Sequence, residues 1–93
     1  MSSGLRVADR SFFMHYVYIL QSELNGRFYI GTTNNVIRRL SEHNSGLVKS
    51  TAPYMPWELK KTEKYANISQ ARRREQFIKT KHSRIIIEKI LAG

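Results

Sequence analysis

The sequence contains no cysteine, and it is also short of acidic residues, proline and long apolar segments. The absence of cysteine excludes disulfide bonds and thiolate metal sites and is compatible with a reducing cytoplasm, where we expect the protein to be located. No apolar run approaches the roughly 20 residues that a membrane-spanning helix requires. The N-terminal segment lacks the continuous apolar stretch of a secretory signal, so we expect no export by that route.

Positive charge is the most prominent feature of the composition. Sixteen lysines and arginines outnumber seven aspartates and glutamates, which gives the 93-residue chain a formal net charge of +9. This excess favours a polyanionic partner, meaning nucleic acid or, as a more distant alternative, an anionic membrane surface. The length suits one domain with a modest core. We expect residues 1–13 to be a leader, disordered or introduced by cloning, and residues 14–93 to form the domain.

Residues 15–31 predict a β-hairpin. Two runs rich in aromatic and β-branched residues, YVYIL and RFYIG, flank Asn25-Gly26, a pair that tolerates the positive φ angles of a tight turn. The alternation of side chains along a strand directs the Tyr29 phenol away from its two apolar neighbours and places Tyr18 on one defined face. In an isolated hairpin, such tyrosines are most simply explained as cross-strand packing partners.

A helix is predicted to follow the hairpin over residues 35–45. Thr33 or Asn34 is suited to cap its first free backbone N–H groups, and Gly46 is suited to end it in the left-handed conformation. The apolar stripe of this helix consists of Val36, Leu40, His43 and Leu47.

Arg39 and His43 are four residues apart on this helix, so they are neighbours at the edge of its apolar stripe. Arg38 should point elsewhere, toward solvent or a phosphate. Most arginines on helices are solvated charges, and a histidine on an apolar stripe is more often a packing residue than a catalytic one. Residue type alone therefore leaves both roles open for Arg39 and His43.

The next segments predict a loop over residues 44–56 and a third strand over residues 57–65. The loop combines charge, hydroxyl groups and an aromatic ring, which suits phosphate contact and base stacking as well as an ordinary surface loop. Its candidate contact residues are Lys49, Ser50, Thr51 and Tyr54. Simple alternation in the strand places on one face Trp57, Leu59, Lys61, Glu63 and Tyr65.

Two further helices complete the predicted fold, one capped by Ser69 and a shorter, isoleucine-rich one from Ser83 to Leu91. One face of the first carries Ala71, Glu75, Ile78 and His82. Glu75 therefore lies among apolar neighbours, where a carboxylate is costly unless it is paired or bound to a metal. Its partner is either a basic side chain, with Arg39 as one candidate, or a metal ion at the floor of a cleft.

The order of these residues resembles the GIY-YIG endonuclease superfamily, and in particular its small single-domain bacterial members. The second triplet, Tyr29-Ile30-Gly31, matches in full, whereas the first reads Tyr16-Val17-Tyr18 and keeps the tyrosine without the glycine. Arg39 and His43 on the next helix and a distant Glu75 complete the pattern, which covers nearly the whole chain.

The resemblance implies an α/β (α+β) fold with a three-stranded antiparallel sheet and packed helices. It also implies a metal-dependent endonuclease that hydrolyses phosphodiester bonds in DNA, nicking it or acting on particular structures. Glu75 would hold Mg²⁺ or Mn²⁺, and Arg39 would bind the non-bridging phosphate oxygens. Tyr18 or Tyr29 would be the general base, favoured as a phenolate by basic neighbours and the metal, with His43 as an assistant.

We expect a monomer that contacts DNA, with RNA left open, through Arg38, Lys49, Tyr54 and Arg72. Many relatives carry an asparagine after the glutamate, but this chain has none beyond Asn67, and the candidates to replace it are Lys79, Lys81 and His82. The rival hypothesis is a catalytically weak or inactive adaptor that binds nucleic acid through the same fold. The inward Glu75 favours the enzyme, because without a metal a carboxylate repels phosphate.

Overall fold

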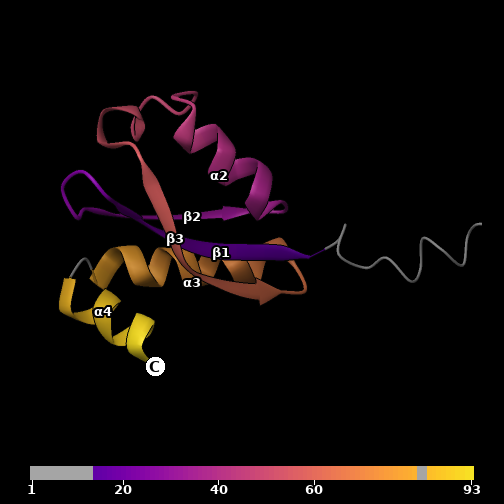
Figure 1. Ribbon diagram of the computed structural model, residues 1–93. Coiled ribbons are helices and arrows are strands. Elements are labelled where there is room, and N and C mark those ends of the chain that lie inside the picture. The colour runs from indigo at the N-terminus through magenta and orange to yellow at the C-terminus, as the bar shows by residue number, and fades with distance from the viewer. Residues whose placement is uncertain (1–13, 82–83) are drawn as a thin grey trace, which may run out of the picture.

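The computed structural model describes residues 14–81 and 84–93, in which a three-stranded antiparallel sheet lies between helices on both of its faces (Figure 1). The sheet order is β2-β1-β3, so that the first strand is central. The elements are β1 (His15–Ser22), β2 (Phe28–Thr33), α2 (Val36–Asn44), the 3₁₀ turn η2 (Ala52–Tyr54), β3 (Trp57–Tyr65), α3 (Ile68–Lys81) and α4 (Arg84–Ala92). This arrangement confirms the predicted α+β fold class. None of the described helices is both long and apolar enough to cross a membrane.

The predicted hairpin is confirmed by the pairing of β1 with β2. Tyr18 lies opposite Gly31, and Leu20 lies opposite Tyr29. The turn between the strands contains Gly26 at a φ of +79°, a conformation that glycine adopts without steric cost. Because β2 pairs only with β1 in the described sheet, it forms one edge of that sheet.

The two faces of the sheet carry separate apolar cores. Helices α3 and α4 cover the larger one, which is built from Val17, Ile19, Ile30, Ala71, Ile78 and Ile87. Helix α2 and the loop after it cover the smaller one, which consists of Tyr18, Leu20 and Trp57, with Tyr29, Leu40, Tyr54 and Met55 packed against them. Tyr18 and Tyr29 therefore both belong to the core under α2, and Tyr29 lies on the opposite face from Phe28 and Ile30, as alternation along the strand predicted.

The prediction that five alternate residues of β3 share one face is wrong. The register places Leu20 opposite Leu59 and Ile19 opposite Lys61, so that Lys60 is an extra residue in β3. Such a β-bulge reverses the alternation on either side of it. Trp57 consequently packs in the core under α2, whereas the far end of the strand packs toward α3.

Both predicted helix caps are displaced from the positions that the sequence suggested. The N-cap of α2 is Asn35, whose side chain accepts a hydrogen bond from the Arg38 N–H at 3.0 Å, rather than Thr33 or Asn34. Thr33 ends β2, and its hydroxyl accepts a hydrogen bond from the Asn35 N–H. At α3, Asn67 takes the capping role by accepting from the Gln70 N–H at 2.9 Å, whereas the predicted Ser69 lies inside the first turn.

The predicted apolar stripe of α2 is wrong at its last member. Leu47 is 73% exposed because the helix ends at Asn44 and Gly46, at a φ of +82°, turns the chain away from the helix axis. The left-handed stop at Gly46 is confirmed. On α3 the predicted inward face is confirmed for Ala71 and Ile78, both fully buried, while His82 lies outside the described residues.

Candidate active site

The centre of the site is a buried contact between Tyr18 on β1 and His43 on α2. The Tyr18 hydroxyl lies 3.0 Å from His43 Nε2, and the two side chains are 2% and 0% exposed. To reach His43, the phenol passes directly over Gly31 of the neighbouring strand. A Cβ atom at Gly31 would come closer than 3.0 Å to three atoms of the ring and hydroxyl of Tyr18, so the glycine leaves the space that the phenol occupies.

Hydrogen bonding on the far side of the His43 ring fixes its tautomer. Nδ1 lies 2.8 Å from the Thr51 hydroxyl oxygen, and that hydroxyl donates its proton to the Val48 carbonyl at 3.3 Å. With the Thr51 proton assigned to this carbonyl, Thr51 accepts from an N–H at Nδ1, and the lone pair of a neutral imidazole is at Nε2. Tyr18 donates its hydroxyl proton to that lone pair. The result is a directed chain from Tyr18 through His43 and Thr51 to the backbone.

The pKa shifts of both groups favour these roles. Burial, followed by the nearby Arg39 charge, lowers the pKa of His43, so the ring is a neutral acceptor at pH 7. Burial also raises the pKa of Tyr18 to about 12, and this effect outweighs the opposing effect of the Arg39 guanidinium. We expected basic neighbours to favour the phenolate, but in the protein alone the loss of hydration dominates. Tyr18 is therefore a proton donor to His43 at neutral pH.

Tyr29 completes an aromatic group on the same face of the sheet. Its ring centroid lies 4.8 Å from that of His43, edge to face, and 6.2 Å from that of Tyr18. Trp57 packs against its other side at 6.2 Å. Unlike Tyr18, the Tyr29 side chain is half-buried. The two predicted catalytic tyrosines and the predicted histidine are thus brought together.

Three arginines come together near the end of β2. Arg39 Nη1 bonds Glu42 Oε1 at 2.8 Å, and Arg38 Nε lies 3.5 Å from the other oxygen of the same carboxylate. Arg38, Arg39 and Arg72 line a polar cavity of about 290 Å³ at the end of β2. Because guanidinium groups match phosphate geometry, this cavity suits a backbone phosphate of a nucleic acid.

Glu75 lies on the other face of the sheet, on α3. Its Oε1 accepts a short hydrogen bond from the Thr32 hydroxyl, and its Oε2 lies 2.6 Å from Lys79 Nζ. The ion pair that we considered for this carboxylate is therefore made with Lys79, whereas Arg39 pairs with Glu42. The side chain is 19% exposed, so it remains accessible to a ligand.

The oxygen donors around Glu75 are of the chemical type that binds a divalent cation. One carboxylate and one hydroxyl oxygen are hard ligands of the kind that Mg²⁺ takes, usually with several waters and substrate phosphates. Within residues 14–81 and 84–93, no group of three or more histidine, aspartate or glutamate side chains gathers into a complete cage. A cation here would therefore depend on water and phosphate for most of its ligands.

The two halves of the site meet at the edge strand β2. The Tyr18 phenol reaches Gly31 from the α2 face, and Glu75 reaches the next residue, Thr32, from the α3 face. The Glu75 charge acts on Tyr18, where it contributes to the raised pKa of the phenol. A phosphate at this edge would be within the influence of both groups.

The other predicted contact residues are less closely connected to this centre. Lys49 is exposed in the loop after α2, and the Tyr54 ring is covered by the Arg27 guanidinium, 4.1 Å from its centroid. Thr51, which we predicted at the loop surface, is 1% exposed and supports His43 instead.

Of the three candidates to replace the missing asparagine, Lys79 is the one that contacts Glu75. Lys81 lies over the Phe77 ring at 5.1 Å, and His82 is outside the described residues. The polar cavity does bring the predicted contacts Arg38 and Arg72 together with Arg39.

Sequence reasoning missed two residues that support the site, Glu42 and Thr32, and the role of a third, Thr51. Glu42 could have been found, because it is three and four residues from Arg39 and Arg38 on a predicted helix. Thr32 and Thr51 bond to residues that are 43 and 8 positions away, which no local pattern reveals.

Comparisons with known proteins show which proteins this chain is similar to. The family profile described as "GIY-YIG catalytic domain" matches residues 14–89. A UPF0213 protein of Halobacterium salinarum is 42% identical over 67 residues, which are 71% of this chain and 86% of that protein. One of Staphylococcus haemolyticus is also 42% identical over 67 residues, 71% of this chain and 80% of that protein. The NMR structure of a UPF0213 protein from Bacillus halodurans is similar with a TM-score of 0.52 and 36% identity, covering 85% of this chain and 83% of that one.

Proposed function

Because this chain belongs to the GIY-YIG family, whose domain supports a nuclease-type function, we propose that it is a metal-dependent endonuclease that hydrolyses phosphodiester bonds in DNA. The observation that carries the proposal is the buried Tyr18–His43 hydrogen bond at 3.0 Å, placed beside Arg39 and opposite Glu75 across the edge of β2. A buried phenol needs a hydrogen-bond partner in either role, but a neutral imidazole is an acceptor that can also take the phenol proton, as catalysis by a tyrosine base requires.

In the proposed mechanism, the Tyr18 proton moves along the existing hydrogen bond to His43 Nε2. The phenolate then takes a proton from the water that attacks phosphorus, and the bond from phosphorus to the leaving oxygen breaks. The proton on His43 is released through solvent to the leaving alkoxide, so that both groups return to their starting states. Because Tyr18 already donates to His43, we assign the base to Tyr18 and the positioning of water or phosphate to Tyr29.

Arg39 would bind the non-bridging phosphate oxygens, for which its permanently charged planar fork is suited. When bound at Glu75, Mg²⁺ or Mn²⁺ would place positive charge next to the phosphoryl and leaving oxygens. Lys79 would then shift from the Glu75 carboxylate toward a phosphate of the substrate, in the role that asparagine has in many relatives.

A single centre of this kind cuts one strand at a time. We therefore propose that the protein acts as a monomer in the cytoplasm, nicking DNA or cutting flaps, junctions or single strands. RNA remains open as a substrate.

The test is a screen of labelled single-stranded, duplex, flap and branched DNA, each incubated with Mg²⁺, Mn²⁺ or EDTA. We expect cleavage of at least one substrate with either metal and none with EDTA. Binding without cleavage of any substrate would replace the enzyme hypothesis with the adaptor hypothesis.

One observation favours that alternative: the ion pair of Glu75 with Lys79 at 2.6 Å neutralises the carboxylate without a metal.

A further inference from the structure

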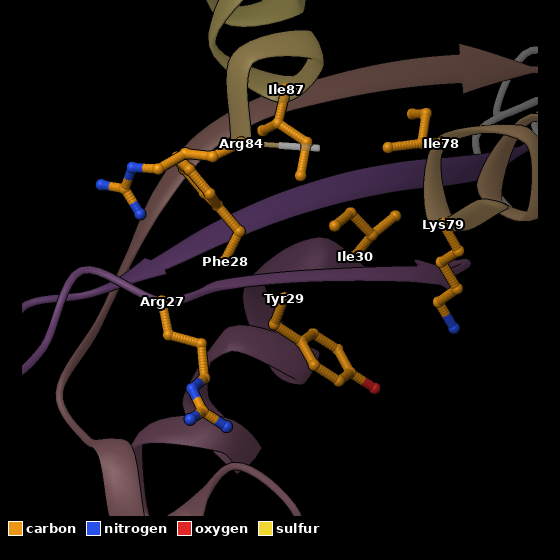
Figure 2. Close-up of a pocket in the computed structure, with 8 residues that line it drawn as sticks. All are labelled: Arg27, Phe28, Tyr29, Ile30, Ile78, Lys79, Arg84 and Ile87. Atoms are coloured by element: carbon orange, nitrogen blue, oxygen red, sulfur yellow. The ribbon is translucent and has the colours of Figure 1, made fainter. Parts of the chain in front are cut away.

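A second cavity, of about 430 Å³, lies against the outer side of β2, between the end of α3 and the start of α4 (Figure 2). Its floor is apolar and consists of Phe28, Ile30, Ile78 and Ile87. The volume falls within the roughly 300–1,000 Å³ of typical small-molecule pockets. Such a floor suits a flat, largely apolar ring system.

The rim of this pocket is basic. Arg84 lies over the Phe28 ring at 5.1 Å, and its guanidinium donates to the Gly26 carbonyl at 3.0 Å. Figure 2 shows Arg84 at one end of the pocket and Lys79 at the other, while the Arg27 side chain points to the opposite side of β2, where it covers the Tyr54 ring. Arg84 and Lys79 are both exposed, and each pairs with a carboxylate of its own helix, Glu88 and Glu75. An apolar floor under a cationic rim is complementary to a group that is apolar in its centre and carries negative charge on either side.

The pocket adjoins the candidate active site through two shared residues. Lys79 lines the pocket and pairs with Glu75, while Tyr29 lines it and packs on the His43 ring. On its other side, Glu75 bonds Thr32, which lines the polar arginine cavity. Glu75 therefore stands between a polar cavity suited to phosphate and an apolar pocket suited to a ring.

We propose that the pocket receives one nucleobase of the bound strand, turned out of its stack, next to the phosphate at Glu75. The free backbone edge of β2 offers N–H and C=O groups to the polar rim of the base, whose burial would otherwise be costly. The phosphates on either side of that base would meet Lys79 at one end of the pocket and Arg84 at the other. This inference rests on the proposed function and specifies it. A strand that is already unpaired gives up its base most easily, so flaps, single strands and frayed ends should be preferred.

Isoleucine methyl NMR tests the proposal, because three of the four floor residues are isoleucines. The probes are the pentanucleotides dA₅ and dT₅ and a five-unit abasic strand with the same number of phosphates. We expect dA₅ or dT₅ to shift the methyl signals of Ile30, Ile78 and Ile87 through the ring current of the base, while the abasic strand leaves them unchanged. Ile37, which is 84% exposed on α2, is the control for non-specific contact and should not follow them.

A matched pair of variants supplies the second measurement. Arg84→Ala should weaken binding of the base-bearing strand roughly two- to fivefold more than binding of the abasic strand, since it removes a cation over the ring site. Lys89→Ala removes the same charge from an exposed position of the same helix and should weaken both strands equally.

Equal methyl shifts with the two kinds of strand, or shifts with neither, would overturn the proposal. Neither readout depends on cleavage. A failure of the nuclease hypothesis, seen as no cleavage in the screen, is therefore distinguishable from a failure of the nucleobase pocket.

Discussion

The Tyr18 phenol occupies the space above Gly31, where any other residue would place its Cβ within 3.0 Å of the ring. The two residues lie opposite each other on neighbouring strands, β1 and β2, and both belong to the triplets that mark the family. Gly31, at the end of the second triplet, thus affects the site by leaving room for Tyr18 of the first triplet. It lets the phenol cross the edge strand and reach His43 at 3.0 Å.

Gly31→Ala should therefore impair both stability and cleavage. The added methyl group has to displace a buried phenol, and overpacking of this kind typically costs roughly 1–3 kcal/mol. Urea unfolding and single-turnover cleavage measure the two effects. In a Tyr18→Ala background the same methyl group should cost much less, because the ring it clashes with is gone. An equal loss of stability in both backgrounds would show that the Tyr18–Gly31 contact is not the cause.

The pH dependence of cleavage should be flat from pH 6.5 to about pH 9. In this range His43 is neutral, since its pKa is lowered from 6.5, and Tyr18 is protonated, since its pKa is raised to about 12. The hydrogen bond between the Tyr18 hydroxyl and His43 Nε2 then contains one proton throughout this range. Its transfer to Nε2 exchanges no proton with solvent. Activity should fall only below pH 6.5, because a proton that His43 takes up from solvent at Nε2 removes the lone pair that accepts the Tyr18 proton. A tenfold rise per pH unit between 7 and 9 would mean that the phenol loses its proton to solvent instead, and His43→Gln should produce that rise.

Thr51 should matter through the tautomer of His43. Thr51→Val keeps the shape of the side chain but leaves the Nδ1–H without its acceptor, which costs roughly 1–3 kcal/mol when the donor is buried. Cleavage should fall, and Thr51→Ser should restore it. Imidazole ¹⁵N NMR should show an Nδ1–H tautomer in the natural protein and in the serine variant. A valine variant with that tautomer and full activity would remove Thr51 from the mechanism.

The sequence was most informative where a pattern is local. The hairpin at Asn25-Gly26 and the inward face of α3 follow from turn chemistry and periodicity, and the structure confirms both. The bulge at Lys60 could not be predicted, because alternation looks the same until the register with β1 is known. The cap positions moved by one or two residues, since neighbouring polar residues such as Asn34 and Asn35 are chemically equivalent in sequence.

The sequence pattern named candidate site residues, but it did not predict the contacts that they make. Arg39 and Glu75 were both identified, yet each pairs with a helix neighbour, Glu42 and Lys79, rather than with the other. The support of His43 by Thr51 depends on how the loop after α2 folds back, and periodicity carries no information on that fold. The raised pKa of Tyr18 likewise depends on burial, which outweighs the basic composition.

Glu75→Gln should abolish metal-dependent cleavage while leaving DNA affinity equal or higher. The amide keeps the shape of the side chain and a hydrogen-bond acceptor for Thr32, but it removes the charge that would hold the cation and repel phosphate. Glu58→Gln, at an exposed ion pair on β3, is the control and should remain active. Affinity is measured by fluorescence anisotropy and cleavage under Mg²⁺ on the substrate found by the screen. Cleavage by Glu75→Gln at the natural rate would refute the metal assignment.

The central claim is that the tyrosine hydroxyls perform chemistry and not only packing. Replacing tyrosine by phenylalanine separates the two roles, because the ring and its buried area remain. Single-turnover cleavage of Tyr18→Phe, Tyr29→Phe and Tyr16→Phe, with thermal melts to confirm folding, is the most direct test. We predict a loss of roughly 10²–10⁴-fold for Tyr18→Phe, a clear loss for Tyr29→Phe, and full activity for Tyr16→Phe. If Tyr18→Phe and Tyr29→Phe both cut as fast as Tyr16→Phe, the proposed active site is contradicted.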